Sequence, residues 1–351
     1  MIIGLLIVLA LILILPFVFK PIEHNLEYFL LAMGIAATLI SGTLSTDLVL
    51  HIFENYLLYF ITGAVLVAGF IFRISVGKIK KFVGYATKRI PISIFVFLLI
   101  IVLGLVSSLI TAIIAALILV EIVHALPFKH SQKVKLTVIS CFAIGLGSAL
   151  TPIGEPLSTI VVSSLKADFT YLFRNIGIYV IPGVLVVAIL GAVIAKMMHK
   201  ANQSEIEGEN SWKDENEGVL ELESIKAVFV RAIKIFLFII ALELLGSGFK
   251  PLINTYVIHL PSMLLYWINI SSAVLDNATL AAAEVSPAMS TKQIQAILMG
   301  LLLSGGMLIP GNIPNIISSG KLGIKSREWA KIGLPLGFAL LIIYFVIIFF
   351  I

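Results

Sequence analysis

Residues 271–279 read Ser271-Ser272-Ala273-Val274-Leu275-Asp276-Asn277-Ala278-Thr279, a polar stretch inside a run that is apolar on both sides. The stretch brings together a carboxylate, a carboxamide and three hydroxyl groups. An ionisable side chain costs several kcal/mol in hydrocarbon, and an unpaired backbone group costs about as much. A membrane chain therefore keeps such a cluster only where it packs against protein or lines a wet cavity.

The composition around this stretch indicates an all-α polytopic membrane protein, with the lipid bilayer as its partner. Of the 351 residues, 60% are apolar and only 12% are charged, and the mean hydropathy is +1.12. A soluble domain carries about twice that share of charged residues. The net charge of +5 does not indicate nucleic-acid binding, because the basic residues lie in loops between apolar runs and report topology.

Two apolar runs, 92–126 and 255–286, do not fit simple membrane spans of about 20 residues. Polar residues interrupt both runs in the middle: Ser107, Ser108 and Thr111 in the first, and the cluster around Asp276 in the second. Each run is too long for one span and too short for two, which predicts two re-entrant hairpins. Segments with the length of simple spans are 2–19, 26–44, 50–72, 174–195, 227–247 and 332–351.

Two further segments, 134–165 and 292–320, each contain about one span and a break rich in proline and glycine. Proline removes a helix donor, and glycine permits non-helical backbone. The sequence therefore predicts two broken helices, whose free carbonyl and amide groups can hold an ion.

The order of span, hairpin, broken helix and span occurs twice, which predicts a repeat. Each unit crosses the membrane three times, so the second unit is expected to be inverted relative to the first, as in secondary transporters. The expected organisation is N-terminal scaffold helices in 1–47, a first repeat in 48–197, an acidic linker in 198–225 and a second repeat in 226–351.

The basic residues predict the orientation of this arrangement. One side of the membrane receives most of the Lys and Arg residues, and the other receives only Lys166, Arg174, Lys250 and Lys292. The positive-inside rule makes the basic side cytoplasmic. We therefore expect a multi-pass plasma-membrane protein with both termini outside and the linker 198–225 cytoplasmic. The linker is a solvated tract, with a regulatory or cation-attracting role as the alternative.

Asp276 and Glu155 are the predicted exchanging carboxylates. Burial favours the protonated form of a carboxylate and a bound cation favours the ionised form, so one carboxylate can exchange a proton for a cation. Glu155 lies in the first break and is the repeat counterpart of Asn312. The alternative for each carboxylate is a helix or hairpin cap.

Oxygen ligands for a hard cation are expected beside these carboxylates. Asn277, Asn312 and Asn315 offer amide oxygens, unless they serve only as turn residues. Freed carbonyl groups are expected near Gly154 and Gly311. Weaker candidates are the hydroxyls of Ser107, Ser108, Thr151, Ser271, Ser272 and Thr279, since hydroxyls in membrane helices usually bond their own backbone. Glu121, His124, Glu243 and Glu284 are gates, proton relays or interfacial anchors.

The residues Ser272 to Asn277, Thr151 to Glu155 and Pro310 to Asn315 resemble motifs of the ion transporter superfamily. That superfamily includes NhaD-type sodium/proton antiporters, arsenite exporters and divalent anion/sodium symporters, and the chain is most similar to a small prokaryotic cation transporter family within it. Glu155 stands where the superfamily usually has Asn, and the added negative charge suits a cationic substrate.

The resemblance implies an elevator mechanism in a homodimer, with hairpins and broken helices moving against a scaffold. It also implies two sodium clamps. Ser107, Ser108, Thr151, Gly154 and Glu155 would form one clamp, and Ser271, Ser272, Asp276, Asn277, Gly311 and Asn312 the other. Asp276, Asn277, Glu155 and Asn312 are the expected sodium ligands.

The expected function is secondary active cation transport, with sodium and protons exchanged by an elevator mechanism. The alternatives are sodium-coupled transport of a carboxylate or oxyanion, and a membrane partner that transports nothing. An enzyme is not expected, because the chain lacks a Gly-x-Gly-Asp motif and a His-Glu-x-x-His motif. No cofactor is expected beyond sodium as substrate or coupling ion.

Overall fold

The computed structural model describes residues 1–23, 25–55, 89–126, 128–206, 224–273 and 277–351, with scattered positions between 58 and 85. Every regular element in these residues is a helix, and no strand occurs among them. The first four are α1 (Ile2–Val18), α2 (Lys20–Glu23), α3 (Leu26–Ser41) and α4 (Thr46–Glu54). The next five are α6 (Ile92–Ile110), α7 (Ala112–Ala125), α8 (His130–Ser148), α9 (Pro156–Ser164) and α10 (Tyr171–Ile206).

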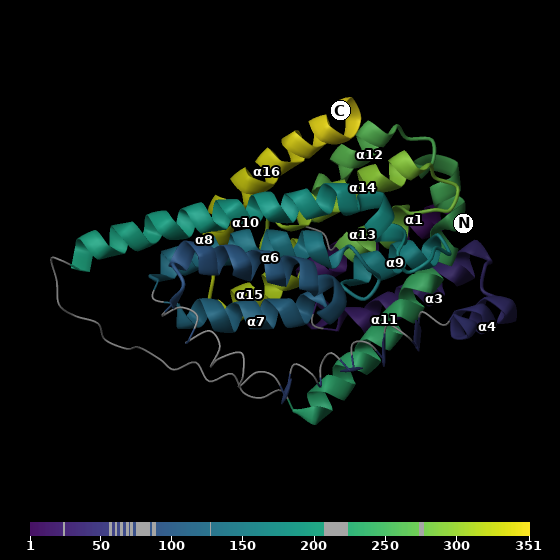
Figure 1. The fold of residues 1–351 in the computed structure, drawn as a ribbon. Coiled ribbons are helices and arrows are strands. Elements are labelled where there is room, and N and C mark those ends of the chain that lie inside the picture. Colours follow the sequence, from purple (N-terminus) through teal and green to yellow (C-terminus); the bar gives the residue numbers. More distant parts are fainter. Residues whose placement is uncertain are drawn as a thin grey trace.

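The second half continues in the same way (Figure 1). Its helices are α11 (Ile225–Leu252), α12 (Ser262–Ile268), α13 (Asn277–Glu284), α14 (Thr291–Gly305), α15 (Ile313–Leu322) and α16 (Ser326–Phe350). Three short non-α turns join them: the π-helix η1 (Ile253–Val257) and the 3₁₀-helices η2 (Asn269–Ala273) and η3 (Ile309–Gly311).

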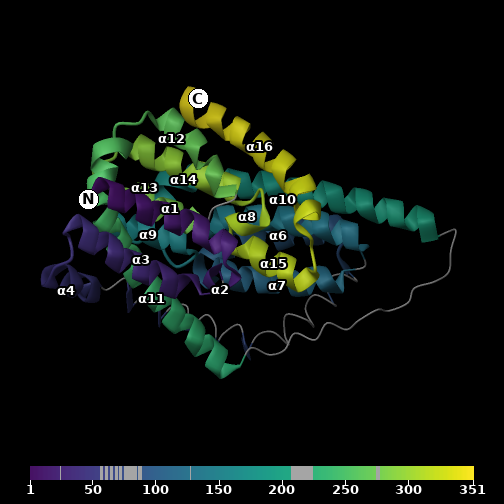
Figure 2. The same ribbon diagram turned by 180° about the vertical axis from the view of Figure 1, so that it is seen from behind.

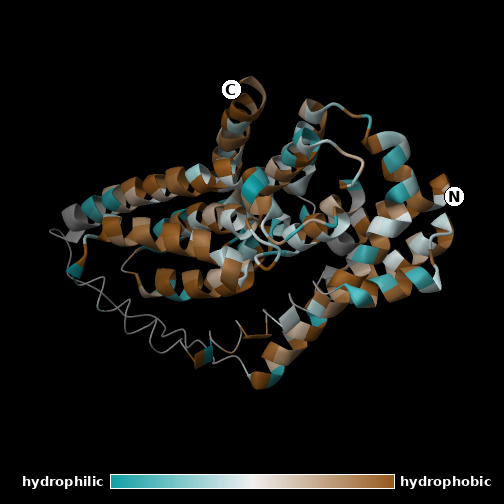
Figure 3. Cartoon of the chain, turned by 45° about the vertical axis from the view of Figure 1, so that its right-hand side comes forward, coloured by the Kyte–Doolittle hydropathy of each residue, from teal (hydrophilic) through white to brown (hydrophobic). Residues whose placement is uncertain are grey.

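The long helices consist largely of apolar residues, which Figure 3 colours brown. Three of the described helices, α6, α10 and α16, are long and apolar enough to cross a membrane. On α10, Ile178 and Met197 are 74% and 66% exposed. Exposed apolar surface on this scale is unfavourable in water. The fold is therefore compatible with a membrane protein.

The first predicted hairpin contains two helices, α6 and α7, that meet at Thr111. Thr111 has φ 78° and ψ 147°, a backbone conformation that an L residue rarely adopts. Its hydroxyl oxygen accepts the backbone N–H of Ile114 and so begins α7. Of the predicted interrupting residues Ser107, Ser108 and Thr111, Thr111 is therefore the one at which the two helices separate.

The second hairpin begins later than the predicted residue 255. The helix α11 contains Pro251 and continues as the π-helix η1 to Val257. Proline removes a backbone donor, and a helix commonly widens where its hydrogen bonds are disturbed. After η1 the chain turns at residues 258–260, just before Pro261. The hairpin therefore consists of α12, η2 and α13. Helix α4 ends at Glu54 within the predicted span 50–72, and much of the rest of that span lies outside the described residues.

Both predicted broken helices are interrupted in the structure. The first breaks between α8 and α9 at residues 149–155, and the second between α14 and α15 at residues 306–312. Pro156 occupies the first turn of α9 and Pro314 the first turn of α15. Proline suits these positions because the first amides of a helix have no intrahelical acceptor. The two breaks lie within the ranges predicted from sequence.

The two broken helices run in opposite directions, which the labels of Figures 1 and 2 allow the reader to follow. The helices that follow the two breaks contact the other half of the chain. Helix α9 packs against α13, and α15 packs against α7. The helix α8 packs against α14. Each hairpin is thus in contact with both broken helices.

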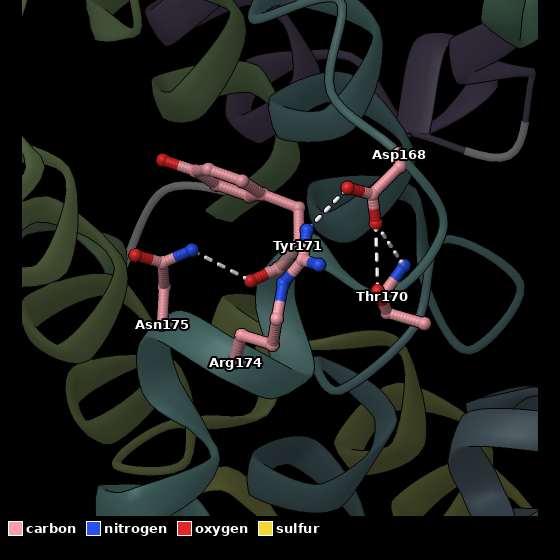
Figure 4. A network of polar contacts seen from close by, with 5 residues as sticks. All are labelled: Asp168, Thr170, Tyr171, Arg174 and Asn175. Carbon is pink, nitrogen blue, oxygen red and sulfur yellow. Dashed lines mark hydrogen bonds and ion pairs between the residues drawn. The ribbon is translucent and has the colours of Figure 1, made fainter.

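A polar turn precedes α10, the longest helix (Figure 4). The carboxylate of Asp168 accepts hydrogen bonds from the backbone N–H of Thr170 at 2.8 Å and from its hydroxyl at 2.7 Å. Arg174, in the first turn of α10, forms an ion pair with the same carboxylate. These contacts fix the chain direction between α9 and α10.

Candidate ion-binding site

The tip of the first hairpin meets the first helix break through direct hydrogen bonds. The Thr151 hydroxyl donates to the Ser108 carbonyl oxygen at 2.5 Å, and the Ala112 N–H donates to the Gly154 carbonyl oxygen at 2.7 Å. The Ser107 hydroxyl donates to the carbonyl oxygens of Gly104 and Ile144. The structure therefore brings the four predicted residues Ser107, Ser108, Thr151 and Gly154 together.

Gly154 is a position where only glycine fits. A Cβ atom on Gly154 would lie 1.9 Å from the Ser148 carbonyl oxygen, far inside contact distance. The next residue, Glu155, is buried and is the N-cap of α9, with extended backbone at φ −156° and ψ 161°. The close turn at Gly154 thus places the Glu155 carboxylate inside the protein at the start of a helix.

The second hairpin approaches the second helix break at Gly311. A Cβ atom on Gly311 would lie 2.5 Å from the Ser272 carbonyl oxygen, 2.6 Å from that of Gly305 and 3.1 Å from that of Ala273. Three carbonyl oxygens from two elements therefore point toward one small region. Carbonyl oxygens are ligands that hard cations prefer.

Side-chain atoms near the same break are buried without a hydrogen-bond partner among the described residues. They are the Ser272 hydroxyl oxygen, the Asn277 Nδ2 and the Asn315 Oδ1. The Asn315 amide group donates its Nδ2 hydrogens to the carbonyl oxygens of Gly305 at 2.8 Å and Leu308 at 2.9 Å. That geometry fixes the Asn315 carboxamide and leaves its oxygen available for a ligand.

Asn312 matches Glu155 in backbone conformation. It is the buried N-cap of α15, with φ −153° and ψ 146°, and its side chain makes no capping hydrogen bond. A Cβ atom on Gly145 of α8 would lie 2.6 Å from Asn312 Nδ2. Asn312 therefore contacts the first broken helix, and the two clamps are neighbours.

The remaining predicted residues have different outcomes. Asp276 lies outside the described residues. Thr279 belongs to α13, and Ser271 belongs to η2, where it is half-buried. Among the described residues, no group of three His, Cys, Asp or Glu side chains is placed to hold a metal ion. The site in its described part is therefore built from carbonyl, amide and hydroxyl groups with Glu155.

Sequence reasoning missed two polar residues beside the breaks. Ser158 is fully buried in α9, and its hydroxyl has no partner among the described residues. It follows Glu155 by three positions, as Asn315 follows Asn312, and this equal spacing was a usable signal. Asn269 of η2 donates to the Glu284 carboxylate at 2.8 Å, and its carbonyl oxygen accepts the Ser304 hydroxyl at 2.6 Å.

Comparison with known protein families matches residues 2–351 to the family described as "Protein of unknown function (DUF1646)". The match covers almost the whole chain. The chain belongs to the DUF1646 family. No curated protein matches the chain. For this DUF1646 protein, a functional inference therefore rests on the geometry of the two helix breaks and on the residues that surround them.

Proposed function

We propose that this DUF1646 protein is a secondary active cation transporter that exchanges sodium for protons. The observation that carries the proposal is the second helix break. Three carbonyl oxygens converge on Gly311, and the Ser272 hydroxyl and Asn315 Oδ1 are buried without partners among the described residues. A buried polar group without a partner costs about 1–3 kcal/mol. A bound cation would offset that cost.

The exchange itself needs a group that binds either a proton or the cation. Glu155 is buried at the first break, next to the hydrogen-bonded tip of the first hairpin. With Asp276, it supplies the two carboxylates of the proposed site. A carboxylate that holds sodium releases its proton, and the reverse step releases sodium, so the two ions share one site in turn.

The architecture proposed around this site consists of two inverted repeats. The opposite directions of the broken helices support this assignment (Figures 1 and 2), as do the packing of α9 on α13 and of α15 on α7. We propose that hairpins and broken helices move together as an elevator against α1, α3 and α11, in a homodimer. Helix α3 packs against both α1 and α11, which suits a scaffold. We propose that both termini lie outside the cell and that the linker 198–225 lies inside it.

The test is proton movement in proteoliposomes that contain a pH-sensitive dye. Addition of sodium is expected to change the internal pH, and the Glu155→Gln and Asp276→Asn variants are expected to abolish the change. Asp168→Asn is the matched control, since Asp168 is an exposed carboxylate in the turn before α10. A folded, inserted protein with no pH response to sodium, lithium or potassium would exclude the antiporter.

Sodium-coupled transport of a carboxylate or oxyanion is the second candidate. Neither Glu155 nor Asn312 caps its helix with a side-chain hydrogen bond, so amide groups at the starts of α9 and α15 can face an anion. Uptake of a radiolabelled anion driven by a sodium gradient, without proton movement, would favour this function over exchange.

A further inference from the structure

A second polar cluster lies away from the two helix breaks, where α9 ends. It consists of Asn55 after α4, Ser163 in the last turn of α9 and Glu243 in α11. Asn55 Nδ2 donates to Glu243 Oε1 at 2.9 Å and to the Ser163 hydroxyl at 3.2 Å. The Ser163 hydroxyl also donates to Glu243 Oε1. Three elements that are far apart in sequence thus meet at one carboxylate.

This carboxylate lines a cleft between α9 and α11. The lining residues are Thr159, Ile160, Ser163, Ser164, Ile239 and Glu243. The cleft is narrow and admits about one water-sized group, which is also the size of a bare monovalent cation. Among the described lining residues there is one acidic side chain and no basic one. The cleft therefore favours a small cation over an anion.

The cleft follows a polar stripe on α9 toward the first helix break. Glu155, Thr159 and Ser163 are spaced by four residues, so they share one face of the helix. Eight residues of α-helix span about 12 Å, which separates Ser163 from Glu155. Thr159 lies between them, and its hydroxyl donates to the carbonyl oxygens of Pro152 and Glu155. Polar atoms thus continue from the cleft to the break.

We propose that the cleft is an entry site for the monovalent cation, with Glu243 as its binding carboxylate and with Ser163 and Asn55 as positioning residues. The inference rests on the proposed function for the ion's destination at Glu155. Glu243 attracts the cation at the end of α9, and the polar face of α9 conducts it toward the helix break. A purely structural anchor between α9 and α11 would need the hydrogen bonds but not the charge of Glu243.

The test measures charge selection in the cleft without any transport. Ser164→Cys is the reporter, because Ser164 lines the cleft and is half-buried, so a reagent too large for the cleft can still reach its thiol from the mouth. Cys141→Ser supplies the background, since Cys141 is the only cysteine of the chain. A cationic methanethiosulfonate reagent is expected to modify the reporter about tenfold faster than an anionic one, as acidic clefts concentrate cations. Sodium is expected to slow the cationic reagent.

Three substitutions make the result specific. Glu243→Gln keeps a hydrogen-bond acceptor and is expected to remove the charge preference, whereas Glu243→Asp is expected to keep it. Glu328→Gln, at an exposed carboxylate in the first turn of α16, is expected to change nothing. An unreactive reporter, or a preference that survives Glu243→Gln, would overturn the entry site.

A transport assay separates this inference from the proposed function. Glu243→Gln is expected to raise the KM for sodium several-fold and to leave the maximal rate nearly unchanged, whereas Glu155→Gln abolishes exchange. If the Ser164→Cys reporter shows charge-selective labelling but the wild type shows no exchange, the entry site stands and the antiporter fails. If exchange occurs and Glu243→Gln alters neither KM nor labelling, the antiporter stands and the entry site fails.

Discussion

Gly311 is the position where a larger residue would disturb the proposed site most directly. The three carbonyl oxygens around it leave no room for a methyl group, since the nearest would lie 2.5 Å from a Cβ atom. These three oxygens are backbone atoms, so the contact cannot be relieved by rotating a side chain. Any larger residue must therefore separate the second hairpin from the second helix break.

We predict that Gly311→Ala lowers the stability by about 1–3 kcal/mol, the usual cost of overpacking, and abolishes sodium/proton exchange. The matched control is Gly320→Ala in the same helix region, where a Cβ atom would meet nothing within 4 Å. Because alanine is the better helix former by about 1 kcal/mol, the control should be neutral or stabilising. The measurement is the melting temperature of each variant in detergent. Equal changes for the two substitutions would contradict the crowding at Gly311.

A substitution at Thr111 is expected to have the opposite effect on stability. The reason is that the backbone of Thr111 is strained, whereas Gly311 is crowded by its neighbours. A non-glycine residue at φ 78° and ψ 147° costs of the order of 1–3 kcal/mol. Loss of the capping hydroxyl in Thr111→Gly costs only a few tenths of a kcal/mol. We therefore expect Thr111→Gly to raise the melting temperature. A decrease would show that the hairpin tip depends on the threonine side chain.

At the scale of an element, the start of α10 predicts a dependence on pH. Hydrogen bonds from Thr170 and the contact with Arg174 hold the pKa of Asp168 below its ordinary value of 3.8. A depressed pKa means that the ionised form stabilises the fold above the unfolded pKa, and that this contribution disappears as pH falls through the folded pKa. The charge of Asp168 therefore stabilises α10 at neutral pH.

The measurement compares the melting temperatures of the wild type and Asp168→Asn across pH. We expect the wild type to be slightly more stable, by a constant amount from pH 7 to about pH 5, with the difference shrinking below about pH 4. The effect is small because the carboxylate is exposed to solvent. A difference that grows toward low pH would have the wrong sign and would contradict the assigned contacts.

Much of each element could be predicted from sequence, because proline and glycine act locally. The proline- and glycine-containing stretches 147–156 and 304–315 predicted both helix breaks, and Ser107, Ser108 and Thr111 indicated the first hairpin tip. At the predicted start of the second hairpin, residue 255, a π-helix after Pro251 carries α11 onward to Val257. Such a continuation depends on packing around the helix, which apolar patterning does not reveal.

At the scale of the whole molecule, the elevator proposal predicts that α9 moves against α11. A Cβ atom on Gly246 would lie 3.8 Å from the Ser164 hydroxyl oxygen, within reach of a disulfide. In the Cys141→Ser background, the pair Ser164→Cys and Gly246→Cys should block exchange when oxidised and restore it when reduced. The measurement is sodium-driven proton movement before and after a reducing agent.

The controls are the single substitutions Ser164→Cys and Gly246→Cys in the same background, because neither can form the cross-link. Each single variant should keep exchange intact under oxidising conditions. If the paired cysteines form the cross-link and exchange continues, α9 does not move relative to α11 as the elevator requires.

The candidate site was predicted as two sets of residues, and the structure brings most of each set together. The contact of Asn312 with Gly145 and the packing of α7 on α15 were not evident from sequence. They join residues that are far apart along the chain, and pattern analysis of neighbouring residues contains no information about such distances. Ser158 was missed because a serine in a membrane helix usually bonds its own backbone, whereas the Ser158 hydroxyl has no partner among the described residues.

Helices from one half of the chain pack against helices from the other half, and this packing also constrains how the protein is made. Helix α7 is complete at residue 125, yet its packing partner α15 begins at residue 313. At ordinary rates of synthesis, the ribosome needs roughly 10–40 s to produce the intervening chain. During that interval the face of α7 that later packs against α15 stays uncovered. Biogenesis of this chain therefore depends on whatever covers that face until α15 has been made.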